Sequence, residues 1–294
     1  MTEKSFREKW LEAVDRKGSV LCAGLDPAEF KMGRGDEGLP ASDIPFNWAL
    51  KYIEAAAPFC AAVKPNINYW KRRDGMQDLY DIANLAHSLG LVVIEDSKLA
   101  DIGSTNDAGM YYARQKGMDA VTFSPFAGNL EEAVKQAHSR DLGLISMVLM
   151  SNPEFGKIKS MWVDVEDDFE AYNGRAGIIC GSHHVEYYLK LARDAQRFGA
   201  DGIVIGAPSP KNHIKEYEIQ AVRKLVDDNM LVLLPGVGKQ GGEAGIIWKY
   251  FGRNNVIVNV GRDLMFPNGS NSTPEQQAEK AKYYFDMLNQ LRAA

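Results

Sequence analysis

The segment LVVIEDSKLAD, residues 91–101, has four apolar residues in a row directly before a group of charged ones. A short, continuous apolar run is typical of a strand buried on both faces of a parallel sheet. We predict one such strand over residues 91–96. Seven other runs resemble it, at residues 20–25, 61–64, 120–124, 143–150, 202–206, 231–234 and 256–260.

Stretches with helical character separate these runs. They cover residues 76–89, 108–116, 130–138, 184–198, 216–227 and 243–251. Gly90, Gly117 and Gly199 each follow such a stretch just before the next strand, as a helix-ending glycine does. Strand and helix alternating eight times predict an α/β fold, a (β/α)8 TIM barrel in which residues 1–294 form a single domain. An open, doubly wound sheet is the alternative.

The composition indicates a soluble, cytoplasmic protein. Hydrophobic residues make up 45% of the chain, enough for a large core, and the net charge of -5 argues against nucleic acid as a partner. Of three scattered cysteines, Cys22 and Cys60 sit in apolar runs, which predicts buried, reduced thiols. We expect no secretory signal and no membrane partner, because the first residues are charged and no apolar run is long enough to span a bilayer.

One connection is unusually long. It covers residues 151–182 and follows the carboxyl end of a predicted strand. In a barrel it would lie over the mouth, where barrel enzymes keep their sites. We therefore expect either an active-site loop or a surface insertion here.

Charged side chains collect where the first three predicted strands stop. Asp26 follows the first run, Lys64 ends the second, and Asp96, Lys98 and Asp101 follow the third. In a barrel these ends meet on one face, so the five would form a compact array of alternating charge. The array could be a structural ion-pair network. It also suits a site that gives a proton to carbon, because acids keep a neighbouring lysine protonated.

A glycine-rich stretch follows the seventh predicted strand. Residues 236–241, GVGKQG, fit the G-x-G-x-x-G pattern of dinucleotide sites. Barrels, however, commonly bind a single phosphate with the loops after strands seven and eight. Gln240, the backbone amides of residues 241–242 and Arg262 would form such a cradle, so we favour a single phosphate. The five histidines show no zinc-ligand spacing, whereas magnesium at the acids stays open.

The pattern Asp96-x-Lys98-x-x-Asp101-Ile102-x-x-Thr105 resembles the signature of the orotidine 5′-monophosphate decarboxylase family. The matching segments span nearly the whole chain. The residues between the fixed positions of the Asp96–Thr105 motif resemble the longer bacterial branch, which carries Asp-Ile-Gly-Ser-Thr at residues 101–105. Leu99-Ala100 departs from the Arg-Gly often found there, at positions that are not catalytic in the family. Further matches are Leu25-Asp26-Pro27, Val63-Lys64-Pro65, Ser124-Pro125-Phe126, Ser151-Asn152-Pro153, Leu234-Pro235-Gly236-Val237-Gly238 with Gln240-Gly241-Gly242, and Gly261-Arg262.

The resemblance implies decarboxylation of orotidine 5′-monophosphate to uridine 5′-monophosphate in de novo pyrimidine biosynthesis, with no metal or organic cofactor. Loss of CO2 from C6 leaves a carbanion in the plane of the ring. Lys98 would stabilise that charge and protonate it, with Asp96 lying against the substrate carboxylate. Lys64 and Asp101 would complete the catalytic array.

The resemblance also implies how the nucleotide is bound. Asp26 would contact the ribose hydroxyls together with Lys64, and Ser151 would hydrogen-bond the pyrimidine. Gln240 and Arg262 would hold the phosphate. Pro235, Gly241 and Gly261 would complete the substrate-binding set.

The family is dimeric across the barrel mouth. The resemblance therefore implies a homodimer with shared sites, in which Asp101 and Thr105 reach into the neighbouring subunit's site.

Three alternatives stay open. A magnesium-dependent aldolase or decarboxylase of a sugar phosphate would need a further acid near the second strand, where this chain has Lys64. A dinucleotide-dependent oxidoreductase could use residues 236–241. A nucleotide-binding protein without activity is disfavoured by the intact set of charged residues.

Overall fold

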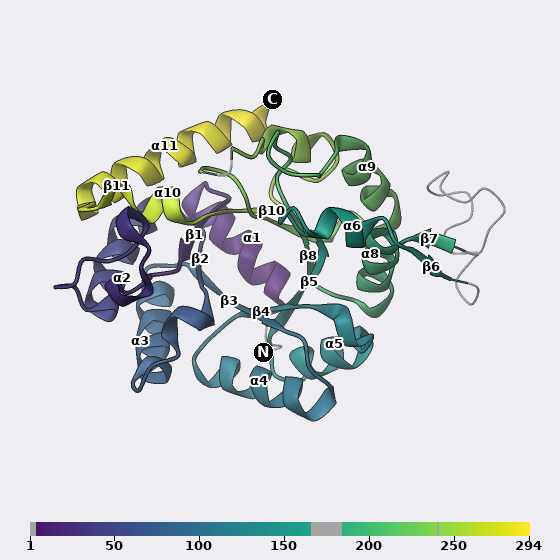
Figure 1. The fold of residues 1–294 in the computed structure, drawn as a ribbon, viewed down its shortest axis with the longest axis horizontal. Coiled ribbons are helices and arrows are strands. Elements are labelled where there is room, and N and C mark those ends of the chain that lie inside the picture. Colours follow the sequence, from purple (N-terminus) through teal and green to yellow (C-terminus); the bar gives the residue numbers. More distant parts are fainter. Residues whose placement is uncertain (1–3, 166–183, 240) are drawn as a thin grey trace.

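The computed structural model describes residues 4–165, 184–239 and 241–294. Eight parallel strands form a closed barrel in the order β1-β10-β9-β8-β5-β4-β3-β2, so the predicted TIM barrel is confirmed and the open sheet is wrong (Figure 1). Each strand lies within two or three residues of its predicted bounds. The strands are β1 (Leu21–Leu25), β2 (Ala62–Pro65), β3 (Val92–Leu99), β4 (Ala120–Phe123), β5 (Gly143–Leu149), β8 (Gly202–Ile205), β9 (Leu231–Leu234) and β10 (Val256–Val260).

Helices surround the barrel (Figure 1). They are α2 (Pro45–Ala56), α3 (Gly75–Ser88), α4 (Gly103–Gln115), α5 (Leu130–His138), α8 (Tyr187–Phe198), α9 (Glu216–Leu225) and α11 (Pro274–Ala293). Helix α8 shows why such segments fold this way: Tyr188, Leu191 and Ala195 repeat at helical spacing and are buried on one face. Gly199 then ends the helix in the left-handed conformation, with φ of 79°, as predicted.

Helix α1 (Phe6–Lys17) lies across the amino-terminal end of the barrel (Figure 1). Trp10 is fully buried there, and its Nε1 donates to the carbonyl oxygen of Asn254 at 2.7 Å. Gly143, at the start of β5, has no room for a side chain, because a Cβ there would lie 2.4 Å from the Cβ of Phe6. Helix α1 therefore packs tightly against the amino-terminal end of the barrel.

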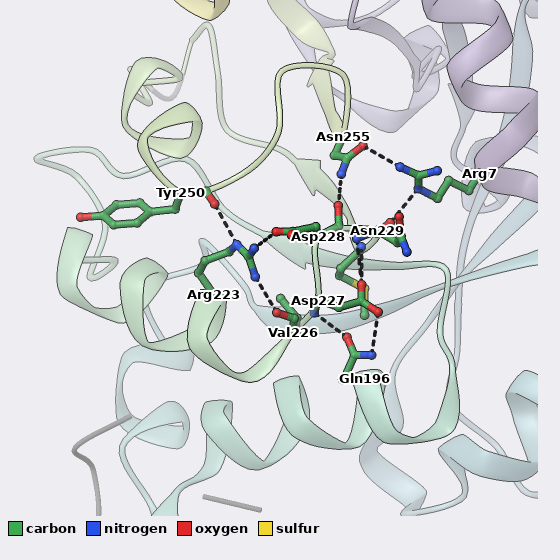
Figure 2. Close-up of polar contacts among 10 residues, drawn as sticks. Arg7, Gln196, Arg223, Val226, Asp227, Asp228, Asn229, Tyr250 and Asn255 are labelled. Carbon is green, nitrogen blue, oxygen red and sulfur yellow. Dashed lines mark hydrogen bonds and ion pairs between the residues drawn. The ribbon is translucent and has the colours of Figure 1, made fainter. Parts of the chain in front are cut away.

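Polar contacts hold the same end of the barrel together (Figure 2). Arg223 on α9 donates to the carbonyl oxygens of Val226 at 2.6 Å and Tyr250 at 2.9 Å. Arg7 on α1 donates to the carbonyl oxygen of Asn229, just before β9, at 3.0 Å. At this end of a barrel such contacts serve stability.

Two predicted helices differ from the structure. Residues 243–251 contain only the 3-10 helix η7 (Gly245–Lys249), because Gly245 and two β-branched isoleucines disfavour an α-helix. The stretch 184–198 begins with a strand, β7 (His184–Glu186), before α8. It pairs antiparallel with β6 (Trp162–Asp164) and buries Val185.

The predicted loop over residues 151–182 is described as far as Val165. That part contains α6 (Phe155–Lys159) and β6, while residues 166–183 lie outside the described residues. The remaining short elements are η1 (Phe30–Met32), η2 (Gly35–Glu37), η3 (Ala57–Phe59), η4 (Ile67–Trp70), η5 (Pro125–Ala127), α10 (Arg262–Met265) and β11 (Pro267–Ser270). None of the described helices is both long and apolar enough to cross a bilayer.

Candidate active site

One carboxylate joins two ammonium groups at the carboxyl ends of β2 and β3. Asp96 contacts Lys64 Nζ through Oδ2 and Lys98 Nζ through Oδ1. Lys64 and Asp96 are only 5% and 8% exposed, whereas the side chain of Lys98 is 46% exposed. Lys98 is therefore the member of this triad that a ligand in the barrel mouth can reach.

The electrostatics keep Asp96 and Lys64 charged. Burial by itself would raise the pKa of Asp96, but the ammonium groups of Lys64 and Lys98 outweigh it and hold that pKa well below its usual value. Burial would lower the pKa of Lys64, yet Asp96 and then Asp26 raise it above its usual value. The site therefore holds an ionised acid and a protonated lysine across the neutral pH range.

Asp26 stands just beyond β1 with part of its hydrogen-bonding capacity unused. Its Oδ1 has no hydrogen-bond partner among the described residues. Burial raises the pKa of this carboxyl group, against the opposing effect of Lys64. A buried acceptor without a partner costs free energy, so the position suits a ligand that brings a donor.

Arg262, the first residue of α10, faces a cavity of about 200 Å³ that Asp26 also lines. Its Nη1 donates to Glu37 Oε2 at 2.6 Å. Lys239, after β9, contacts the other oxygen of Glu37 at 3.4 Å. Glu37 was missed by the sequence analysis, and its only signal was its place in the β1–α2 connection. Arg34 and Tyr69 line the same cavity.

The glycine-rich stretch forms a tight turn beside this cavity. Gly236 and Gly238 have φ of 97° and 100°, a region that favours glycine. Gly242 has no room for a Cβ, which would lie 2.6 Å from the carbonyl oxygen of Gly236. Gly241 is described and exposed, whereas the predicted Gln240 lies outside the described residues.

Ser151 lies on another wall of the barrel mouth. It lines a cavity of about 410 Å³ together with Asn152, Ser209 and Lys211. Lys239 lines this cavity as well and contacts Glu37 of the first cavity. Ser151, predicted to contact the pyrimidine, and Arg262, predicted to contact the phosphate, therefore face neighbouring cavities.

Pro235 and Gly261 follow the strands β9 and β10 directly and are half-buried. The carbonyl oxygen of Pro235 accepts from Ala207 N at 2.8 Å, which ties the end of β9 to the connection after β8. Gly24 on β1 allows the close approach of the two strands, because a Cβ on Gly24 would lie 2.8 Å from the Cα of Gly261. Pro235 and Gly261 therefore lie at the carboxyl ends of two paired barrel strands.

Asp101 and Thr105 lie apart from the charged triad. Both are exposed, and Asp101 Oδ1 accepts from the backbone N–H of Ile102 at 2.7 Å. Within residues 4–165, 184–239 and 241–294, neither is hydrogen-bonded or ion-paired to the triad, and no group of acids, histidines and cysteines could hold a metal ion. A single chain therefore brings Lys64, Asp96 and Lys98 together but leaves Asp101 outside.

Comparisons with known proteins identify a family for this chain. Residues 19–280 match the model of the orotidine 5′-phosphate decarboxylase / HUMPS family. The orotidine 5′-phosphate decarboxylase of Thermomicrobium roseum is 31% identical over 98% of this chain and 96% of its own length. The enzyme of the same name from Bordetella avium is 28% identical over 98% of this chain and all of its own.

Solved structures share the fold. The crystal structure of a putative orotidine-monophosphate-decarboxylase from Toxoplasma gondii matches with a TM-score of 0.77 at 22% identity, covering 99% of this chain and 97% of that one. Orotidine 5′-monophosphate decarboxylase from Methanocaldococcus jannaschii, in complex with the inhibitor BMP, matches with a TM-score of 0.62 at 23% identity, covering 92% and 98%.

Proposed function

The chain belongs to the orotidine 5′-phosphate decarboxylase / HUMPS family, and we propose that it decarboxylates orotidine 5′-monophosphate to uridine 5′-monophosphate in de novo pyrimidine biosynthesis. The observation that carries this proposal is the ionised Asp96 carboxylate held between Lys64 and the accessible Lys98. The reaction would take place in the cytoplasm. The buried free thiols of Cys22 and Cys60 suit a reducing compartment.

Lys98 supplies the proton. When the bond between C6 and the carboxylate breaks, CO2 leaves and the electron pair stays on C6 as a carbanion. The ammonium group of Lys98 stabilises this charge through space and then transfers a proton to C6. The neutral amine regains a proton from solvent, so the cycle needs no metal or organic cofactor.

Asp96 acts on the carboxylate that leaves. It is ionised, and in our proposal it lies against the negatively charged group of the substrate, so that loss of CO2 relieves their repulsion. Lys64 is buried beneath Asp96 and keeps it charged. Because the neighbouring Lys98 is half-exposed, it can leave Asp96 and approach C6.

The remaining residues hold the nucleotide. Asp26, with its unpartnered Oδ1, accepts from a ribose hydroxyl beside Lys64. Arg262 and Gln240, with the amide of Gly241, bind the phosphate. This binding energy is remote from the bond that breaks and orients the base over Lys98.

Ser151 hydrogen-bonds the pyrimidine, and Pro235 and Gly261 form the floor on which the nucleotide lies. These roles are supported by the positions of the three residues, which lie just beyond the ends of β5, β9 and β10.

We propose that the active unit is a homodimer with shared sites. Asp101 and Thr105 are exposed beside the mouth, where they can complete the site of the second subunit. Their neighbours Ile102 and Phe126 are 68% and 84% exposed, although both are large and apolar. An exposed apolar surface of this kind suits contact with another protein chain.

Two other functions have less support. A magnesium-dependent reaction on a sugar phosphate needs a further acid at β2, and Lys64 stands there with a charge that repels a divalent cation. A dinucleotide site needs a helix that begins at the glycine-rich turn, whereas η7 is a short 3-10 helix that starts only at Gly245.

The test is turnover of orotidine 5′-monophosphate by enzyme treated with excess EDTA. Full activity without metal is expected, followed by the absorbance change on loss of the carboxylate. Activity that appears only when magnesium is restored would favour the sugar-phosphate branch. Tight NADH binding with no binding of uridine 5′-monophosphate would favour the dinucleotide alternative.

A further inference from the structure

The strand that carries Lys98 does not run regularly into its neighbour. In the β3–β4 pairing, Glu95 lies opposite Val121 and the next paired residue, Leu99, lies opposite Phe123. Four steps along β3 (95 to 99) therefore face two along β4 (121 to 123), which is a bulge. Lys98 lies inside it with φ of 47°, a left-handed conformation that is unfavourable for a residue with a side chain.

Thr122 on β4 lies opposite this bulge and is 1% exposed. Its Oγ1 accepts a hydrogen bond from the backbone N–H of Lys98 at 2.9 Å. The same Oγ1 lies 3.2 Å from Asp96 Oδ1. One buried hydroxyl thus contacts both the backbone of the proposed proton donor and the carboxylate that holds its ammonium group.

The charges fix the direction of both hydrogen bonds. Asp96 is ionised and can only accept, so the Thr122 hydroxyl donates its single proton to Oδ1. The lone pairs of Oγ1 are then free for the N–H of Lys98, which can only donate. A hydroxyl can donate to Asp96 and accept from the N–H of Lys98 at the same time. A side chain that lacks either capacity leaves one of these two groups without its hydrogen bond.

We propose that Thr122 is a positioning residue for the decarboxylation site. Its hydroxyl holds the bulge in the conformation that directs Lys98 into the mouth and keeps Asp96 in line with it. Thr122 touches neither the mouth nor the reacting atoms and acts through Lys98 and Asp96. This inference rests on the proposed function and extends it to a residue in the core.

The other reading of Thr122 is that it only fills space in the barrel. The two readings differ in what valine should do at this position, because valine has nearly the same shape but no hydroxyl. If Thr122 only packs, Thr122→Val should leave catalysis intact. If it positions Lys98, Thr122→Val should lower kcat, whereas Thr122→Ser should restore it because serine keeps the hydroxyl.

A matched control is available on the neighbouring strand β5. Ser146 is also fully buried, and its Oγ has no hydrogen-bond partner among the described residues. Ser146→Ala therefore removes a buried hydroxyl that does not touch the triad. It reports the effect of such a deletion on the barrel alone.

The experiment measures kcat and KM for orotidine 5′-monophosphate, affinity for uridine 5′-monophosphate and thermal unfolding. Thr122→Val should lower kcat by about 10- to 100-fold, since small misplacements of catalytic groups have effects of this size. KM and product affinity should change less than about threefold, and Thr122→Ser and Ser146→Ala should stay near the wild type.

A Thr122→Val protein with wild-type kcat would overturn the inference, as would a Thr122→Ser protein impaired as much as the valine variant. If valine prevents folding, Thr122→Ala against Thr122→Ser makes the same comparison. A wild-type chain that fails to turn over orotidine 5′-monophosphate would refute the proposed function instead, so the two failures are distinguishable.

Discussion

Arg262 Nη1 donates to Glu37 Oε2 at 2.6 Å, so the cation proposed for the substrate phosphate already holds a carboxylate. Lys239 contacts the same Glu37 side chain. The hydrogen bond from Arg262, with Lys239 adding to it, holds the pKa of Glu37 below its usual value, and it therefore stays ionised. A phosphate that binds Arg262 must compete with this internal anion.

We predict that Glu37→Gln strengthens binding of uridine 5′-monophosphate. An exposed ion pair contributes about 0.2–1 kcal/mol, so a gain of roughly 1.4- to 5-fold is expected at low salt. Titration calorimetry at two salt concentrations measures it, and the gain should shrink as salt screens the pair. Glu29→Gln removes a charge from the same connection but outside this pair and serves as the control. Weaker binding by Glu37→Gln would mean that Glu37 orients Arg262 for the phosphate.

Replacing Lys98 by alanine should abolish turnover. Loss of a proton donor that also stabilises the carbanion should lower kcat by at least about 10³-fold. Affinity for uridine 5′-monophosphate should fall only a few-fold, because other residues hold the phosphate and ribose. Lys135→Ala, on the exposed face of α5, controls for loss of a lysine charge. Turnover that survives in Lys98→Ala would show that another group donates the proton.

The fold and the charged triad could be predicted because both follow from strand periodicity. Apolar runs mark the strands, and closing the barrel then brings the ends of β2 and β3 together with Lys64, Asp96 and Lys98. Glu37 could not be predicted, since it meets Arg262 across 225 residues of sequence through the conformation of an irregular connection.

The role of Thr122 could not be predicted from the sequence, for a different reason. In the sequence it is an ordinary β-branched strand residue, and only the bulge in β3 turns its hydroxyl into a partner of Lys98 and Asp96. Register shifts of this kind depend on tertiary packing and leave no pattern in the sequence.

The Asp26 side chain should lower the stability of the folded protein at neutral pH and strengthen nucleotide binding. Burial raises its pKa above the value of the unfolded chain, so the folded state is penalised once this carboxyl ionises. Relative to the ionised form, the protonated carboxyl group of Asp26 favours the folded state. This contribution is fully present below the unfolded pKa of about 4 and is lost as the pH rises through the folded pKa. Asp26→Asn should therefore raise the melting temperature at pH 7, and this gain should shrink toward pH 4.

The same Asp26→Asn variant should bind uridine 5′-monophosphate more weakly, because the proposed ribose acceptor loses its charge. Melting followed by calorimetry and nucleotide titration at pH 7 gives both quantities. A protein that is destabilised at pH 7 yet binds normally would mean that Asp26 is a structural partner of Lys64.

The polar contacts at the amino-terminal end of the barrel should affect the stability of the protein but not its catalysis. Arg223→Met removes hydrogen bonds to the carbonyl oxygens of Val226 and Tyr250 and leaves them without this donor (Figure 2). We expect a loss of about 1–3 kcal/mol in the free energy of unfolding. Denaturant unfolding measures it, and kcat per folded molecule should not change. A lower kcat at full folding would link this face to the site.

The shared site predicts that two inactive proteins restore each other. Asp96→Asn and Asp101→Asn should each be nearly inactive as homodimers. Random exchange of subunits makes half of the dimers mixed, and each mixed dimer has one site with both native acids and one with neither. Activity should therefore rise to about a quarter of the wild-type value on mixing. Subunit exchange is verified with differently tagged chains. Exchange without any recovery would mean that Asp96 and Asp101 serve the same subunit's site, which would require the exposed Asp101 to move toward Lys98 of its own chain.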